Sequence, residues 1–140
     1  MGIFLRARLG TRLMACSAAL LTVAAGLGIR SAASGVVAKY AGDALYTLLV
    51  LALVVLVAPR VRPAVAAWVA LGFSWAVELF QLTGVPAELS ARSTLARLVL
   101  GTTFNVPDLF WYATGAAVGW AVHRAVGARR GGRQSFGTTG

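Results

Sequence analysis

The sequence has few charged residues, very few acids, and almost no cysteine or histidine. Only 12% of its 140 residues are charged, whereas a soluble domain carries about 25% charged residues. One cysteine excludes an internal disulfide and a cysteine cluster for a metal, and one histidine offers little to a zinc site. The sequence also lacks a glycine-rich phosphate-binding loop and a nucleophile elbow. These absences favour a non-enzymatic protein without a cofactor or a metal.

Long apolar segments make up most of the chain. Hydrophobic residues account for 59% of it, and the mean hydropathy is +0.78. Because about 17–25 apolar residues let a helix cross a bilayer, we predict an all-α polytopic membrane protein, with four transmembrane helices in one domain over residues 1–124. The predicted spans are residues 13–29, 41–58, 64–82 and 107–124. We expect residues 125–140, rich in Gly, Arg, Ser and Thr, to form a disordered cytoplasmic tail.

Two apolar segments have a second interpretation. The first span is short, and the small residues at 31–34 would suit cleavage of a signal peptide. We favour a retained first helix. Residues 98–104 are apolar but too few to cross a membrane, so they would either re-enter it or lie on its surface. They follow the polar connector, residues 85–97, that separates the third and fourth spans.

The basic residues lie between the apolar segments rather than on one soluble face. The net charge is +9, from 13 Lys and Arg against four acids. Nine of the basic residues fall on the side of both termini and four on the other side. Because positive charge accumulates in cytoplasmic loops, we predict cytoplasmic termini and no nucleic-acid partner. Richness in Ala, Val, Gly and Arg favours a bacterial source, and hence the bacterial cytoplasmic membrane.

Glu78 is the only charged residue within the third predicted span. A carboxylate there costs roughly 2.5–3.5 kcal/mol on insertion scales, so it usually faces a protein interior and has a partner. Ser74 and Gln81 share its helix face, four residues before and three residues after it. Since a guanidinium binds a carboxylate through two hydrogen bonds, we predict that Glu78 pairs with Arg92 or Arg97.

The other acids are also expected in the outer half of the protein. Asp43 opens the second predicted span and Asp108 opens the fourth, where either could simply cap its helix. Together with Glu78 they could instead hold a hard cation such as Mg²⁺, although three carboxylates on separate helices are a weak pattern. We expect one outward-facing pocket with these candidate ligand-binding residues: Asp43, Tyr46, Glu78, Gln81, Arg92, Arg97, Asp108 and Tyr112.

Several short motifs resemble those of a known bacterial family. They are Gly42-Asp43-Ala44-Leu45-Tyr46, Glu78-Leu79-Phe80-Gln81, Arg92-Ser93-Thr94, Arg97-Leu98-Val99-Leu100-Gly101 with Phe104, and Asp108-Leu109-Phe110-Trp111-Tyr112 with Gly115 and Gly119. Over residues 40–120 the chain therefore resembles domain-of-unknown-function family 2809, which implies a small multi-span membrane protein without an assigned activity. One departure is Leu82-Thr83, where the family would favour an aromatic residue.

A more distant resemblance concerns the order of the polar residues. The series Glu78, Gln81, Arg92 and Asp108 is similar to that of the VanZ-like proteins, whose namesake is associated with resistance to teicoplanin. Tyr112 stands where those proteins would have an asparagine. The resemblance implies a role in the cell envelope and transfers no mechanism.

We expect a non-enzymatic envelope protein whose outer pocket binds a membrane lipid head group or a lipid-linked cell-wall precursor. The first alternative is a small proton-coupled transporter that uses Glu78, because membrane carboxylates form proton relays. The second alternative is an intramembrane enzyme acting on a lipid phosphate, for which the sequence offers neither a metal site nor a nucleophile. Gly115 and Gly119 favour close helix packing, and stripes of small residues would permit a homo-oligomer.

Overall fold

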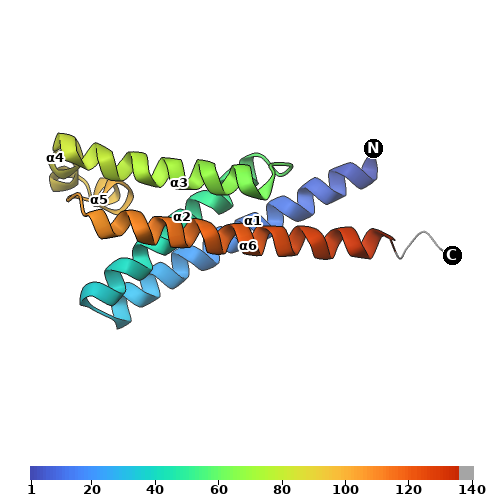
Figure 1. The fold of residues 1–140 in the computed structure, drawn as a ribbon, viewed down its shortest axis with the longest axis horizontal. Helices are drawn as coiled ribbons and strands as arrows, with labels where there is room; N and C mark the ends of the chain where they lie inside the picture. The colour runs from blue at the N-terminus through green and yellow to red at the C-terminus, as the bar shows by residue number, and fades with distance from the viewer. Residues whose placement is uncertain (136–140) are drawn as a thin grey trace.

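The structure is a computed structural model that describes residues 1–135. All regular secondary structure in this range is helical, which confirms the all-α prediction. The long helices are α1 (Gly2–Ala32), α2 (Gly35–Val57), α3 (Pro63–Phe80) and α6 (Val106–Ser135). The short elements between α3 and α6 are the 3₁₀ turn η1 (Gln81–Thr83), α4 (Val85–Arg92) and α5 (Thr94–Leu100) (Figure 1).

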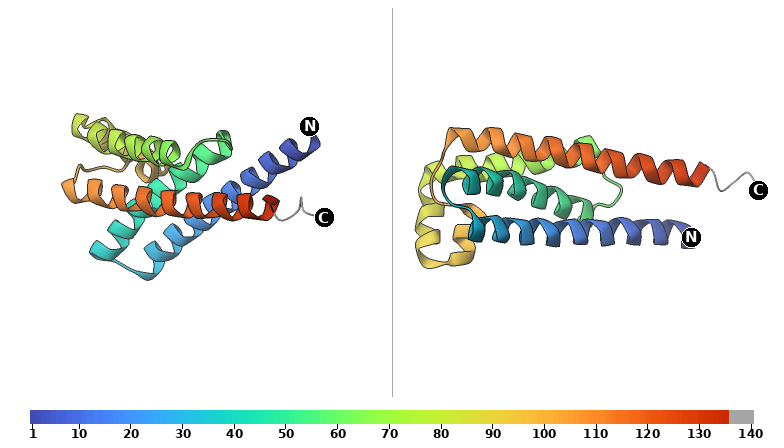
Figure 2. Two further views of the ribbon diagram at one scale, coloured as in Figure 1. Left: turned by 45° about the vertical axis from the view of Figure 1, so that its right-hand side comes forward. Right: turned by 90° about the horizontal axis from the view of Figure 1, so that it is seen from below.

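The long helices are arranged around α2. It packs against α1 in a helical hairpin, and also against α3 and α6, which lie side by side. The short helices α4 and α5 close one end of the molecule, and the start of α1 and the end of α6 lie at the other end (Figure 2). The buried apolar core lies between these ends, where α2 and α3 meet through Leu51, Val55, Ala66 and Ala70. The molecule therefore has two chemically distinct ends joined by an apolar middle.

Three helices are long and apolar enough to cross a membrane: Gly2–Ala32, Gly35–Val57 and Pro63–Thr83. The fourth predicted span, in α6, is not among them. Its residues include Asp108 near the start and His123 and Arg124 at the end, and glycine, tryptophan and tyrosine residues between them, which lower its mean hydropathy. The structure thus supports a protein with membrane-length helices. A count of four spans stays a prediction.

The start of α2 and the end of α6 differ from the predicted boundaries, which had been set at charged residues. α2 begins at Gly35 rather than residue 41, so Asp43 lies inside the helix and not in its first turn as expected. α6 runs to Ser135, so the prediction of disorder is wrong for residues 125–135, while residues 136–140 lie outside the described residues. A charge ends an apolar run, but Lys and Arg are good helix formers. The hydropathy pattern therefore located the apolar segments rather than the helix ends.

Two glycines allow a close contact between α2 and α6. A Cβ atom at Gly115 of α6 would collide with the backbone of Ala44 in α2, and one at Gly119 would meet the side chains of Leu48 and Leu51. These contacts confirm the packing interpretation of the two glycines. They also bring the first turns of α6 against the middle of α2, where the polar residues gather.

Candidate functional site

Glu78 lies on α3 near the end closed by α4 and α5, and it is only 1% exposed. Its Oε1 accepts a hydrogen bond from the backbone N–H of Asn105 at 2.8 Å, and its Oε2 accepts one from the Tyr112 hydroxyl at 3.0 Å. Both carboxylate oxygens therefore have a donor, as a buried carboxylate requires. Through these bonds Glu78 joins α3 to α6 and to the segment that leads into α6.

The prediction that Glu78 pairs with Arg92 or Arg97 is wrong. Arg92 lies on the exposed face of α4, with its Nη2 3.9 Å from Glu88 Oε1. Arg97 of α5 donates instead to the backbone carbonyl of Ser90 at 3.1 Å. The prediction relied on charge alone, whereas neutral donors satisfy Glu78. A backbone N–H leaves no mark in a sequence, so the Asn105 contact could not be found there.

Asp108 is the centre of a second group of contacts. It lies in the first turn of α6, as predicted, and is 4% exposed. Its Oδ1 is 3.1 Å from the Lys39 ammonium and accepts a hydrogen bond from the side-chain amide of Asn105 at 3.0 Å. Asp43, one turn after Lys39 on α2, lies close enough to interact electrostatically with Asp108 and Glu78. Residues from α2, α3 and α6 thus form one polar cluster.

Two buried acceptor atoms in this region have no hydrogen-bond partner among residues 1–135: Asp43 Oδ2 and Gln81 Oε1. Gln81 shares the buried face of Ser74 and Glu78, as its spacing predicted. Its amide nitrogen donates to the Leu100 carbonyl at 2.6 Å, which fixes the side chain against the end of α5. A buried acceptor without a donor costs about 1–3 kcal/mol. Both atoms would therefore gain from a ligand that donates hydrogen bonds.

A cavity of about 860 Å³ opens beside this cluster, between α1, α2, α3, α5 and the start of α6. We call its three carboxylates the acid wall, and they are buried or half-buried: Asp43, Glu78 and Asp108. We call its three cations the cation rim, and they are exposed: Arg30, Lys39 and Arg97. Apolar side chains of α1 and α5 complete the lining, among them Val23, Leu27, Leu95 and Leu98.

Seven of the eight predicted site residues line this cavity, and Arg92 does not. The sequence argument missed Arg30 and Lys39 as site residues, and also Asn105, whose two donors contact Glu78 and Asp108. For Lys39 a signal existed, because it precedes Asp43 by four residues and so shares its helix face. For Arg30 the sequence held no such signal, since only tertiary packing brings α1 to the cavity.

Metal binding gains no support from this geometry. Within residues 1–135 no group of three or more His, Cys, Asp or Glu side chains is arranged to hold a metal ion. The carboxylates of the acid wall instead contact protein donors or a lysine. The geometry of residues 1–135 therefore does not support the alternative in which the three carboxylates hold Mg²⁺.

These features define a class: an all-helical protein with membrane-length helices and one buried polar cluster at the end of its helix bundle. The family described as "Protein of unknown function (DUF2809)" matches residues 32–116, more than half of the chain, and the chain belongs to this family. The match contains the whole acid wall, and of the cation rim it omits only Arg30. Comparisons with curated proteins and with solved structures give no match.

Proposed function

We propose that this protein is an envelope-related protein of the bacterial cytoplasmic membrane, and that its cavity binds a lipid head group or a lipid-linked cell-wall precursor. The observation that carries the proposal is the separation of charge within the cavity. The acid wall is buried, and the cation rim is exposed. A ligand with a phosphate and with hydrogen-bond donors, such as an ammonium or hydroxyl group, complements both.

The two halves of such a head group would have different partners. Guanidinium and ammonium groups of the cation rim suit a phosphate, because charge-assisted hydrogen bonds to phosphate are the strong ones. The unpaired acceptors Asp43 Oδ2 and Gln81 Oε1 suit the donors of the ligand. Apolar side chains of α1 and α5 line the same cavity and would contact an acyl or prenyl chain. A soluble zwitterion would leave those apolar contacts unused.

In this proposal α6 is the fourth span and both termini are cytoplasmic. The uneven distribution of Lys and Arg, nine against four, supports this orientation. The cavity then faces outward, which is where lipid-linked wall precursors are consumed in bacteria. Tyr40 and Trp111, whose rings stack with centroids 5.3 Å apart, would lie at the outer membrane–water interface.

Between binding and proton-coupled transport, the packing of the apolar middle favours binding. A transporter needs a route from the cavity to the end that holds the termini. One helical turn from Glu78 toward that end, the hydroxyl of Thr47 donates a hydrogen bond to the hydroxyl of Ser74 at 2.9 Å. Beyond them Ala66 and Ala70 are completely buried and pack with Leu51 and Val55 of α2. We therefore place transport second, to be supported by flux driven by a pH gradient in proteoliposomes.

The test is native mass spectrometry of the full chain, extracted from bacterial membranes in a mild detergent. We expect a bound phosphate-containing lipid in the unmodified protein. Asp43→Asn should lower its occupancy about tenfold, because one charge-assisted hydrogen bond is worth about 1.5–3 kcal/mol. Asparagine keeps the size of the side chain, so the cavity should keep its shape.

Glu88→Gln is the matched control, since Glu88 is an acid of the same end that lies on α4, exposed and outside the cavity. It should retain the lipid at the unmodified level. Equal occupancy in Asp43→Asn and the unmodified protein would contradict the proposal. So would an equal loss in both variants, which would point to general charge rather than to the cavity.

A further inference from the structure

The end of the molecule that holds both termini has a cavity of its own. It has a volume of about 600 Å³ and lies between the first turns of α1 and the turn that connects α2 to α3. Its polar lining consists of arginines alone: Arg6, Arg8, Arg12 and Arg60. Apolar residues, among them Leu5, Leu9 and Val57, form the rest of its wall.

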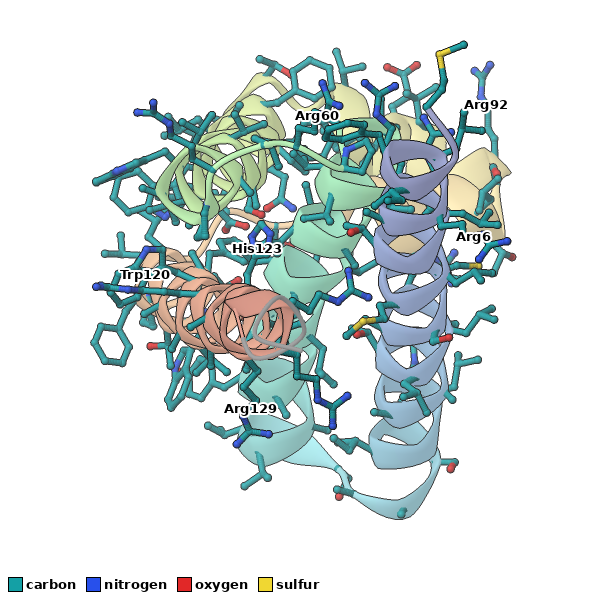
Figure 3. All side chains as sticks on the ribbon, turned by 90° about the vertical axis from the view of Figure 1, so that its right-hand side faces the viewer. Arg6, Arg60, Arg92, Trp120, His123 and Arg129 are labelled. Carbon is teal, nitrogen blue, oxygen red and sulfur yellow. The ribbon has the colours of Figure 1, made fainter. Side chains whose placement is uncertain are left out.

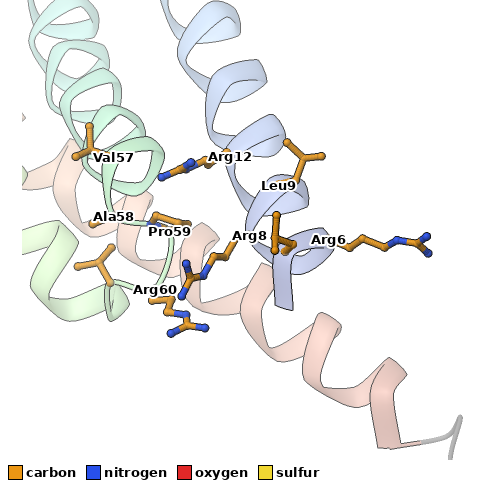
Figure 4. Close-up of a pocket in the computed structure, with 10 residues that line it drawn as sticks. Arg6, Arg8, Leu9, Arg12, Val57, Ala58, Pro59 and Arg60 are labelled. Atoms are coloured by element: carbon orange, nitrogen blue, oxygen red, sulfur yellow. The ribbon is translucent and has the colours of Figure 1, made fainter. Parts of the chain in front are cut away.

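The arginine side chains do not all point the same way. Figure 4 shows Arg8 and Arg12 directed from α1 toward the α2–α3 turn, where Arg60 lies, whereas Arg6 points away from the turn. No acid neutralises these three guanidinium groups, so an anion that enters the space between them is attracted by all three. No acidic residue lines this cavity, and the ion pairs of residues 1–135 lie elsewhere.

The positive-inside rule accounts for the number of arginines here but not for their convergence. That rule depends only on how many Lys and Arg residues lie near the membrane. It therefore applies equally to an arginine whose side chain points away from the cavity. Figure 3, which looks onto this end, shows Arg6, Arg60 and Arg129 on three different parts of the chain. A second cavity at this end, of about 720 Å³, is lined by Arg129, Arg130 and Arg133, but all three come from α6, whereas Arg8, Arg12 and Arg60 come from two separate segments.

The length of α1 places this cavity at the membrane surface. A helix of 31 residues is about 46 Å long at 1.5 Å per residue, which exceeds the roughly 30 Å of a hydrocarbon core. The excess of about ten residues falls at the start of α1, which carries Arg6, Arg8 and Arg12, because residues 13–29 contain no charge. In the same turns Leu5 and Leu9 are exposed, as is Val57 at the end of α2. Cationic and apolar groups therefore alternate at the depth of phospholipid head groups.

We propose that this cavity binds the head group of an anionic phospholipid. Arg8, Arg12 and Arg60 hold the phosphate, because the planar guanidinium donates paired hydrogen bonds to its oxygens. The acyl chains extend along the exposed apolar side chains beside the cavity. A free phosphate ion would satisfy the arginines but would leave those apolar side chains without a partner. This site is separate from the cavity of the acid wall, at the opposite end of the molecule.

The experiment titrates the full chain in detergent with phosphatidylglycerol or with phosphatidylcholine of the same acyl composition, and measures bound lipid by native mass spectrometry. We expect the unmodified protein to prefer phosphatidylglycerol. The triple variant Arg8→Gln, Arg12→Gln, Arg60→Gln should bind it at least tenfold more weakly, since each surface cation contributes roughly a fivefold effect on binding to anionic lipid. Arg6→Gln is the control, because the Arg6 side chain points away from the turn; it should lose no more than the roughly fivefold effect of one surface cation.

Three results would overturn the proposal: equal binding of the two lipids, a loss in Arg6→Gln as large as in the triple variant, or displacement of phosphatidylglycerol by excess inorganic phosphate. Asp43→Asn, in the other cavity, should leave the preference unchanged, which separates this test from that of the proposed function. Should the Gln triple variant fail to fold, the corresponding Lys triple variant replaces it. Lysine keeps the charge but not the paired donors, so severalfold weaker binding is expected, and undiminished binding contradicts the assigned contacts.

Discussion

At the end closed by α4 and α5, carboxylates are buried and bonded to groups on other segments, whereas at the end of the termini arginines are exposed. Glu78 and Asp108 each have donors within the chain. Arg8, Arg12 and Arg60 line a cavity without any acid. Arg130, which donates to the Thr11 hydroxyl at 2.8 Å, is an arginine of that end with a side-chain partner.

Charged residues therefore have two different roles in this protein: they connect segments at one end and are available to external anions at the other. A buried carboxylate with protein donors connects the segments that supply them, so its removal should destabilise the fold. An exposed arginine without a protein partner adds little to folding and is free to bind an external anion. Stability measurements at the two ends should therefore diverge, and the following variants test that divergence in order of expected effect.

Glu78→Ala should have the largest effect. It leaves the half-buried Asn105 N–H and the buried Tyr112 hydroxyl without their acceptor. At about 1–3 kcal/mol for each unsatisfied group, the free energy of unfolding should fall by about 2–6 kcal/mol. Unfolding of the purified protein in mixed micelles measures this. The control is Glu88→Ala, which removes only an exposed contact to Arg92 and should change stability by less than about 0.5 kcal/mol. Similar losses in both variants would refute the connecting role of Glu78.

Gly115→Ala should have an intermediate effect, because it separates the helices that hold the polar cluster together. The new Cβ atom collides with the Ala44 backbone, which cannot rotate away. Overpacking of this kind costs about 1–3 kcal/mol, more than the up to about 1 kcal/mol that alanine gains over glycine in a helix. Gly127→Ala, also in α6, meets no atom within 4 Å. It should be neutral or stabilising, so the two variants should differ in sign in the same unfolding assay.

The smallest effect on stability is expected at the end of the termini. The triple variant Arg8→Gln, Arg12→Gln, Arg60→Gln removes three exposed charges and no hydrogen bond to another described side chain. Its free energy of unfolding should change by less than about 0.5 kcal/mol in lipid-free detergent. A loss comparable to that of Glu78→Ala would show that both ends use charge in the same way, and would remove the contrast between them.

Periodicity and charge were enough to predict the helical class, the shared face of Ser74, Glu78 and Gln81, and the position of Asp108 in a first turn. These properties depend on spacing along one helix, which a sequence displays directly. The same reasoning placed Asp43 in a first turn, because Lys39 looked like the edge of a segment. The structure shows a helix that runs through that charge.

The partners of Glu78 could not be predicted in the same way. One donor is a backbone N–H that follows the α4–α5 connector, and every non-proline residue carries such a group. The position of Asn105 depends on how α4 and α5 fold back, including the bond from Gln81 to Leu100. Tyr112 was among the predicted site residues, and its spacing of four residues from Asp108 puts both on one helix face. Its contact with Glu78 required the packing of α3 against α6.

The hydrogen bond from Asn105 to Glu78 has a consequence for how the site can be observed. Asn105 lies just before the first residue of α6, in a segment without regular structure, where backbone amides normally exchange quickly with solvent. Because Glu78 accepts this amide, its proton should exchange slowly as long as the cluster is closed. Hydrogen–deuterium exchange at this single amide thus reports the opening of the polar cluster in the unmodified protein, without a label and before any ligand is known.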